Sequence, residues 1–120
     1  MEHRQQQHHR ARVAEALREE VTSIVEGELS DPRVAGVSVS DFHLSGDGKT
    51  VRVFVTVHGE EDEGERALAG LGAAKGYIRR ELVARLGLRQ SPELIFELDR
   101  SQQCGARIDE LLRRAGKRKR

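Results

Sequence analysis

The chain has 120 residues, enough for one domain in which a single sheet packs against two or three helices. Its 21 Lys and Arg nearly balance its 20 Asp and Glu, so the net charge of +1 does not by itself indicate a nucleic acid partner. The single cysteine, Cys104, excludes an internal disulfide framework and a cysteine-based zinc site, as is typical of a reducing compartment.

Apolar residues recur at helical spacing over residues 8–29, from Val13 through Leu17 and Val21. Arg, Glu and Thr occupy the opposite face, so the pattern predicts an amphipathic helix. Asp31 and Pro32 should end it, because the residue before a proline disfavours helical backbone. We expect residues 1–7 to be a flexible N-terminus ahead of the domain.

The hydrophobic period changes to two over residues 37–44 and again over residues 50–57. The intervening SGDGK stretch contains turn-forming residues, so this region predicts a β hairpin. The first strand changes parity near Asp41, which predicts a β bulge. The GDGKT letters also resemble the end of a phosphate-binding loop, but that loop joins a strand to a helix. A nucleotide site is therefore rejected here.

Two short helices and a strand are expected after the hairpin. The apolar residues that mark the first helix are Ala67, Leu68, Leu71 and Ala74, and those that mark the second are Ile78, Leu82 and Leu86. Gly87 should end the second helix as its C′ residue. Pro92 then precedes an alternating strand with Leu94, Phe96 and Leu98. The expected order is α, β, β, α, α, β in one α+β domain over residues 8–112, with a basic flexible tail over residues 113–120.

The junction of the two short helices, residues 72–80, reads GAAKGYIRR. Backbone amides at a helix start lack intrahelical partners and attract phosphates. Lys75, Arg79 and Arg80 would add positive charge, and Gly76 would permit a close backbone approach. We therefore expect a phosphate-binding site at this junction. The alternative is that Gly76 only permits a tight turn and that the arginines form an ordinary solvated face.

No pattern indicates catalysis, a metal site or a cofactor, because Ser, His, Asp and Cys104 are scattered along the chain. No segment has the length and hydrophobicity of a membrane span, and we expect a cytoplasmic protein without membrane contact. Three of the four aromatic residues, Phe42, Phe54 and Phe96, lie in expected strands and are assigned to the core. Only Tyr77 remains near the junction, so recognition should depend on phosphates and RNA shape more than on base stacking.

The predicted element order is that of a type II KH domain, in which a GxxG turn between two helices clamps a nucleic acid backbone. No GxxG occurs here. Ala74, Lys75 and Gly76 instead resemble the Ala-x-Gly interhelical kink that replaces GxxG in the ribosome-binding factor A family. The similarity covers about residues 12–112 and includes RVAEALREEV, DPR, VRVFVTV and KGYIRRELVARLGLRQSPELIFELDRS.

This resemblance implies a KH-like fold and a non-enzymatic factor that assembles the small ribosomal subunit. Such a factor binds 30S precursors as a monomer, assists maturation of 16S rRNA including its 5′ end, leaves before translation, and supports growth in the cold. The residues that match the family motif and its flanks are Ala74, Lys75, Gly76, Arg79 and Arg80. Arg33, Arg85 and Arg89 are added as RNA-binding candidates on charge alone. A protein interaction module without direct RNA binding is the alternative.

Overall fold

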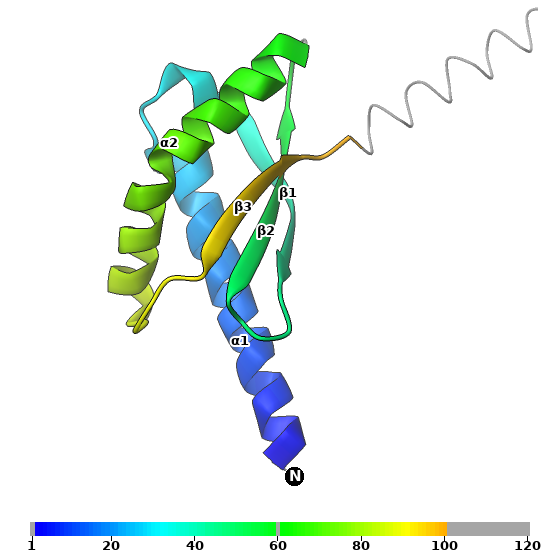
Figure 1. Cartoon of the computed structure of the whole chain (residues 1–120), viewed down its shortest axis with the longest axis vertical. Helices are drawn as coiled ribbons and strands as arrows, with labels where there is room; N and C mark the ends of the chain where they lie inside the picture. The colour runs from blue at the N-terminus through cyan, green and yellow to red at the C-terminus, as the bar shows by residue number, and fades with distance from the viewer. Residues whose placement is uncertain (1, 60, 101–120) are drawn as a thin grey trace, which may run out of the picture.

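The computed structural model describes residues 2–59 and 61–100 as a mixed α and β domain (Figure 1). Two helices and a three-stranded sheet form its frame, which confirms the predicted α+β class. In chain order the elements are α1 (Glu2–Ser23), a π turn η1 (Ile24–Glu28), a 3-10 turn η2 (Pro32–Val34), β1 (Val37–Leu44), β2 (Thr50–Val57), α2 (Glu61–Leu86) and β3 (Glu93–Leu98). Cys104, the remaining residues 101–112 of the predicted domain and the tail 113–120 lie outside the described residues.

Helix α1 is longer than the apolar periodicity predicted. It begins at Glu2 rather than near residue 8, so it runs through most of the segment that we expected to be flexible. Periodicity cannot detect this part, because it is polar, whereas Glu, Gln and Arg are good helix formers that extend an existing helix at little cost. The predicted C-terminal end is confirmed, since η1 ends at Glu28 and the side chain of Asp31 caps η2.

The predicted hairpin is confirmed with the same bounds. β1 pairs antiparallel with β2, and β3 lies parallel to the other edge of β2, which gives the strand order β1-β2-β3. The pairing register shifts between Val39 and Asp41, so the predicted bulge is present. Val51, Val53 and Val55 are fully buried on one face of β2, as the alternation of a half-buried strand requires.

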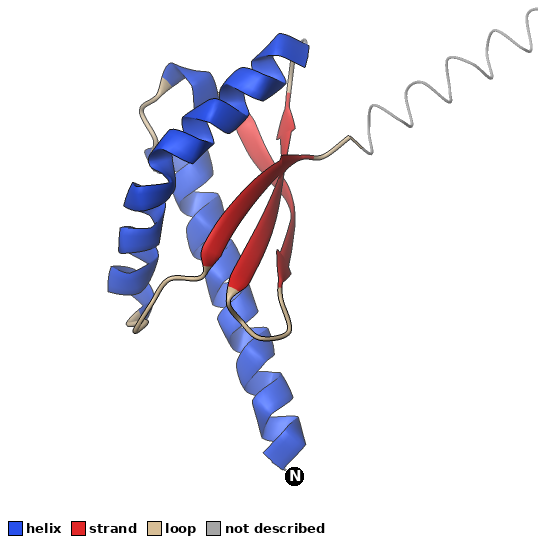
Figure 2. Cartoon of the chain, viewed as in Figure 1, coloured by secondary structure: helices blue, strands red, loops and turns tan. Residues whose placement is uncertain are grey.

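The hydrophobic core lies between this face of the sheet and the two helices. Helix α1 contributes Leu17 and Val21, and α2 contributes Leu71, Ile78 and Leu82, all of them buried. Figure 2 shows α1 passing behind the strands and α2 running alongside them. The alternate residues of β2 point to the opposite face of the sheet. That face carries no buried residue of β2 and is open to solvent.

Two of the three strand aromatics join the core as predicted. Phe42 and Phe96 pack against the buried cluster. The core assignment of Phe54 is wrong, because Phe54 pairs with Asp41 on β1 and with Glu97 on β3, on the open face of the sheet. Strand alternation could have predicted this position, because Phe54 lies between the buried Val53 and Val55 and must point to the other face. The prediction failed because it considered only that Phe54 is aromatic and lies in a strand.

Helix α2 corrects the predicted element order. It is helical without interruption from Glu61 to Leu86, so the expected pair of short helices is one helix that changes direction along its length (Figure 1). Gly72 and Gly76 lie inside it, and neither has a positive φ. Each glycine costs about 1 kcal/mol relative to alanine in a helix. Burial of Leu71, Ile78 and Leu82 contributes about 1.5–3 kcal/mol each, which outweighs that cost.

The end of α2 is as predicted. Gly87 has a φ of 63°, in the left-handed region that favours glycine at a helix C′ position. The Leu88 amide donates to the Val83 carbonyl at 3.2 Å, which is the long hydrogen bond of a Schellman end. This sharp end turns the chain back toward β3 and keeps the second half of α2 beside that strand.

Candidate nucleic-acid interface

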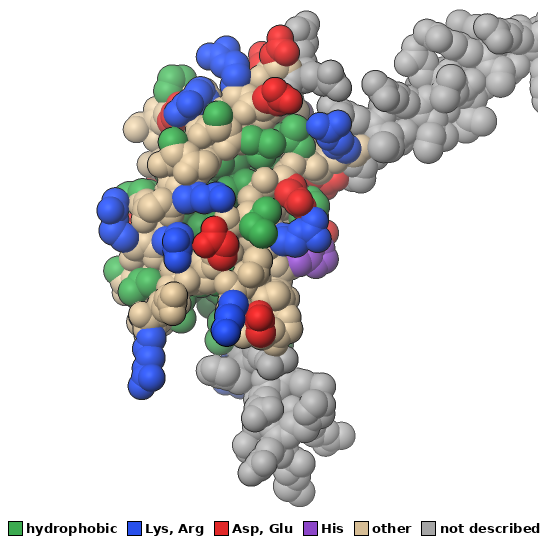
Figure 3. Space-filling view, viewed as in Figure 1, with side chains coloured by type: hydrophobic (Ala, Val, Ile, Leu, Met, Phe, Trp, Pro, Cys, Tyr) green, Lys and Arg blue, Asp and Glu red, His purple; other side chains and the backbone are tan. Residues whose placement is uncertain are grey.

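Three cations lie on the second half of α2. Lys75 and Arg79 are four residues apart and share one side of the helix, and Arg80 directly follows Arg79. Among the described residues, neither Lys75 nor Arg80 forms an ion pair. Figure 3 shows Lys and Arg side chains gathered along α2, whereas basic, acidic, histidine and apolar side chains are mixed over the strands. Lys75 and Arg80 are therefore available to an anionic partner.

Arg79 is the most constrained of the three. Its Nη1 lies 3.9 Å from Oε2 of Glu93, and both side chains are partly exposed, at 39% and 56%. A pair this long and this exposed contributes little, about 0–1 kcal/mol. Within the described residues its Nε is buried without a hydrogen-bond partner. Arg79 is thus oriented by its surroundings but is not neutralised by a close carboxylate.

A shallow hollow connects Arg79 and Arg80 to the loop after α2. It is lined by Gly76, Arg79, Arg80, Val83, Ala84 and Ser91. Gly76 is exposed, and a Cβ built on it would meet no atom within 4 Å. The backbone of α2 can therefore be approached closely from solvent at this position. Gly70, on the same helix, differs from Gly76, because the side chains of Val34 and Arg33 occupy the space where its Cβ would lie.

The continuous helix corrects one part of the expected mechanism. The sequence indicated a helix start near Gly76, with free backbone amides pointing at a phosphate. Inside an unbroken helix those amides bond to carbonyls four residues earlier, so they cannot hold an anion. Any phosphate at this surface must instead be bound by the side chains of Lys75, Arg79 and Arg80.

Lys49 joins the same surface, although the sequence did not indicate it. Lys49 lies in the turn between β1 and β2, and its carbonyl accepts a hydrogen bond from the Glu93 amide at 2.8 Å. A second hollow beside the first is lined by Gly48, Lys49, Arg79, Gln90, Ser91, Pro92 and Glu93. The two hollows share Arg79 and Ser91. We refer to Lys49, Lys75, Arg79 and Arg80 as the cationic surface.

The turn that carries Lys49 is held by side-chain hydrogen bonds. Oδ1 of Asp47 accepts hydrogen bonds from Ser45 Oγ at 2.6 Å and from the Lys49 amide at 3.0 Å. These two bonds lower the pKa of the Asp47 carboxyl. The Ser45 hydroxyl oxygen in turn accepts from the Thr50 amide at 3.0 Å. In the sequence, Lys49 belongs only to the rejected phosphate loop, and its place beside α2 depends on the parallel pairing of β3, which no local pattern shows.

Arg85 and Arg33 are held by carboxylates. Arg85 bonds to Glu20 on α1, Glu28 in η1 and Glu81 on α2, and these bonds raise its pKa. The pair with Glu81, four residues before Arg85 on the same helix, is one of these three. This arginine joins three elements and is not directed to a ligand.

Arg33 is paired within its own turn. Its Nε lies 3.1 Å from both carboxylate oxygens of Asp31, and its Nη2 lies 2.7 Å from Oδ2. Arg33 in this way lowers the pKa of Asp31. Arg89 is exposed in the loop after α2, without an ion pair to any described residue. Of the three cations added on charge alone, only Arg89 is free in the described structure.

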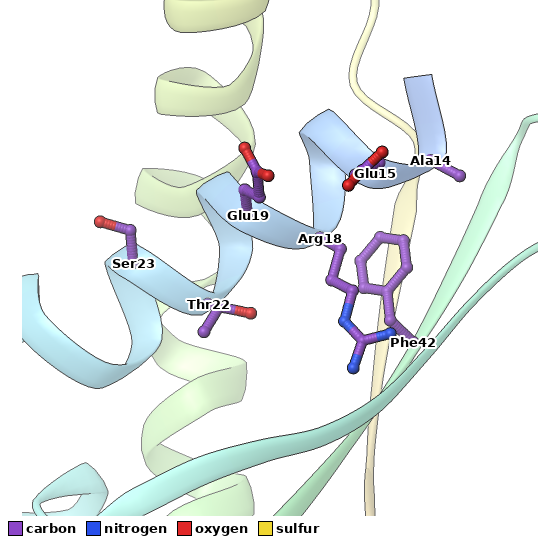
Figure 4. Close-up of a pocket in the computed structure, with 7 residues that line it drawn as sticks. All are labelled: Ala14, Glu15, Arg18, Glu19, Thr22, Ser23 and Phe42. Carbon is purple, nitrogen blue, oxygen red and sulfur yellow. The ribbon is translucent and has the colours of Figure 1, made fainter. Parts of the chain in front are cut away.

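A separate hollow lies between α1 and β1. Figure 4 shows Ala14, Glu15, Arg18, Glu19, Thr22 and Ser23 along one side of α1, with Arg18 beside the ring of Phe42. This hollow holds no arrangement of nucleophile and base. Within residues 2–59 and 61–100 no group of three His, Cys, Asp or Glu side chains could hold a metal ion. No helix in these ranges is long and apolar enough to cross a membrane.

The family model described as ribosome-binding factor A matches residues 9–112. The chain belongs to the ribosome-binding factor A family. Ribosome-binding factor A of Koribacter versatilis (strain Ellin345) is 53% identical over 119 residues, which cover 99% of this chain and 97% of that protein. The family assignment made from the sequence is confirmed.

Solved structures of ribosome-binding factor A have the same fold. The crystal structure of the protein from Thermus thermophilus is 33% identical, with a TM-score of 0.59, and the match covers 78% of this chain and 94% of that one. A homology model of the Thermus thermophilus protein, as fitted into the cryo-EM map of a 30S-RbfA complex, is 31% identical with a TM-score of 0.57. It covers 76% of this chain and 91% of its own. The matched family region includes the whole cationic surface.

Proposed function

We propose that this ribosome-binding factor A protein is a non-enzymatic assembly factor for the small ribosomal subunit. It binds 30S precursors in the cytoplasm as a monomer and assists maturation of 16S rRNA, including its 5′ end. Two findings support this proposal: membership of a family named for ribosome binding, and the relative that was fitted into the map of a 30S complex. The cationic surface is the part of the chain that would contact the RNA.

The observation that carries the proposal is the state of the α2 cations. Lys75 and Arg80 have no ion pair within the described residues and Arg79 has only a distant one. Lys49, in a hydrogen-bonded turn, lines a hollow together with Arg79. Structural arginines in the same molecule, such as Arg85, are saturated with carboxylates. The contrast indicates that the surface cations serve an external anion, and the phosphates of folded RNA fit this chemistry.

Recognition would depend on RNA shape more than on base identity. Tyr77 is the only aromatic side chain among the described residues that is both large and exposed, with 38% of its surface accessible. One ring can stack on one base, whereas sequence-specific readers of single strands use several. By holding one arrangement of phosphates, the protein would raise the population of one rRNA conformation. This would matter most in the cold, when misfolded RNA rearranges slowly.

The segment Ala74 to Gly76 would take the role of a GxxG clamp without breaking the helix. In this form of the KH-like proposal, α2 stays hydrogen-bonded throughout and its exposed glycine lets the RNA backbone come close to the helix surface. Arg79 and Arg80, three and four residues after Gly76, would then lie beside the approaching phosphates. The change of direction along α2 would set the angle between this clamp and β3.

Binding to 30S precursors as a function of salt tests the proposal. Wild-type affinity should fall by about 0.7–0.9 log units per log unit of salt for each phosphate neutralised. The triple variant K75E/R79E/R80E should bind more weakly, with a salt slope smaller by about two to three. Arg66→Glu, an exposed charge reversal on the first half of α2, is the matched control. An unchanged affinity and slope in a folded triple variant would place the RNA site elsewhere.

A further inference from the structure

The face of the sheet opposite the core forms a second surface, chemically unlike the first. The strand pairing places two rows on it, one of His43, Arg52 and Ile95 and one of Asp41, Phe54 and Glu97. Glu93 lies on the same face of β3, two residues before Ile95. We refer to these seven residues as the outer sheet face. No buried residue of β2 points into it.

Two apolar side chains occupy the centre of the outer sheet face. Ile95 is 38% exposed and is, with Tyr77, one of two large hydrophobic side chains that are exposed in the described structure. Phe54 lies beside it under a layer of polar groups. The Arg52 guanidinium stands 5.3 Å from the centre of the Phe54 ring, and the His43 ring meets it edge-on at 5.7 Å. An apolar patch with an ordered polar rim is typical of a protein contact.

The charge of this face is opposite in sign to that of the cationic surface. Asp41, Glu93 and Glu97 provide three carboxylates against one arginine and one histidine, with no lysine on the face. The charges are ordered, since Arg52 Nη2 lies 2.6 Å from Glu97 Oε2 and Asp41 Oδ2 lies 3.0 Å from His43 Nε2. The amide of Phe42 and the ring of His43 lower the pKa of Asp41. A surface of this sign repels RNA phosphates and attracts lysine and arginine side chains.

We propose that the outer sheet face binds a protein segment that carries lysine or arginine beside an apolar side chain. The apolar group would cover Ile95, and the cation would reach Glu93 or Glu97. On a ribosomal precursor the protein would then contact RNA through the cationic surface and a basic protein through the adjoining sheet. This inference extends the proposed function, because the two contacts use different faces.

Photocrosslinking on purified 30S precursors tests the inference. The crosslinker p-benzoylphenylalanine is placed at Ile95 and, as a control of equal exposure, at Tyr77 in the full chain. Position 95 should crosslink to a protein through a peptide rich in lysine or arginine, and position 77 should crosslink to rRNA. A crosslink from position 95 to rRNA, to a second copy of this chain, or to nothing while position 77 reacts would overturn the inference. Failure at both positions, without binding, would reject the proposed function as well.

A charge reversal gives a second measurement. Glu97→Lys should weaken binding to precursor particles roughly threefold to tenfold and leave binding to protein-free 16S rRNA unchanged or slightly stronger. The K75E/R79E/R80E variant should weaken both. Glu65→Lys, an exposed residue on the first half of α2, controls for the change in net charge. If Glu97→Lys binds particles as tightly as wild type, or loses affinity for protein-free rRNA, no basic protein contacts this face.

Discussion

Arg79 of α2 and Glu93 of β3 meet where the cationic surface borders the outer sheet face, with Nη1 and Oε2 3.9 Å apart. Glu93 is also the residue whose amide bonds to the Lys49 carbonyl, so its backbone holds one cation of the surface while its side chain faces another. The side chain places a negative charge beside the proposed phosphate site. It would be expected to limit RNA affinity rather than to support the fold, because exposed pairs of this length stabilise little.

Glu93→Gln should therefore strengthen binding to rRNA. Removing this carboxylate frees Arg79 and lowers the repulsion on an approaching phosphate, by about 0.4–1 kcal/mol, or roughly twofold to fivefold in dissociation constant. The backbone hydrogen bond to Lys49 is kept in this variant. Filter binding to 16S rRNA at low salt measures the effect, and Glu65→Gln serves as the control for net charge. Weaker binding by Glu93→Gln would show that the carboxylate orients Arg79 for the RNA.

Two glycines on one turn of α2 should respond oppositely to alanine. A Cβ at Gly70 would lie 2.9 Å from Cγ1 of Val34 and 3.1 Å from Cβ of Arg33, whereas a Cβ at Gly72 would meet nothing within 4 Å. Gly70→Ala should lower the free energy of unfolding by about 1–3 kcal/mol, because η2 must move away from the helix. Gly72→Ala should raise it by about 0.5–1 kcal/mol. Urea denaturation measures both, and a stabilising Gly70→Ala would contradict the close packing of η2.

The Glu28 and Arg85 pair should make stability depend on pH. Hydrogen bonds from Arg85 lower the pKa of Glu28 below its ordinary value of 4.5. A lowered pKa in the folded state contributes stability that is complete above about pH 4.5 and is lost as the pH falls through the folded value. Wild type should therefore be more stable than Glu28→Gln at pH 7, and the difference should shrink as the pH falls below the ordinary value of 4.5. Glu19→Gln, an exposed change on α1, controls for the removal of one carboxylate.

Local patterns in the sequence predicted most of the fold, because the strands and turns here follow local rules. The hairpin, its bulge, the strand after Pro92 and the left-handed Gly87 each depend on a few neighbouring residues. The wrong prediction of two short helices in place of α2 arose because a non-local effect decides the structure there. Glycines near Gly76 indicated a turn, but the helix continues because Leu71, Ile78 and Leu82 are buried against the sheet. Burial of this kind is a tertiary effect that residue spacing cannot measure.

The sequence predicted the part of the candidate site that lies on one helix, but not the part that depends on contacts between elements. Lys75, Arg79 and Arg80 lie close together because they are neighbours on one helix, and spacing alone is enough to show this. The pairing of β3 with β2 places Lys49 near Arg79. Arg85 instead forms ion pairs with Glu20 and Glu28, which belong to other elements. Whether a cation is free or paired depends on such contacts, so charge in the sequence overestimates the number available to RNA.

Gly76→Ala should separate stability from function. The glycine lies inside α2 without a positive φ, and a Cβ there would meet nothing within 4 Å, so alanine should stabilise the fold by about 0.5–1 kcal/mol. The same methyl group would project into the hollow shared with Arg79 and Arg80 and hold an RNA backbone farther from those charges. Binding to 30S precursors should weaken roughly threefold to tenfold, or about 0.7–1.4 kcal/mol.

Gly72→Ala is the matched control, because it adds the same methyl group to the same helix outside that hollow. It should raise stability without changing affinity for the precursors. Urea denaturation and sedimentation binding on the two variants give both quantities for each. If Gly76→Ala and Gly72→Ala bind equally well, then the RNA backbone does not approach α2 at Gly76, and the cations must reach it from a greater distance. Equal losses in both would instead indicate that added helix stiffness, rather than the methyl group, opposes binding.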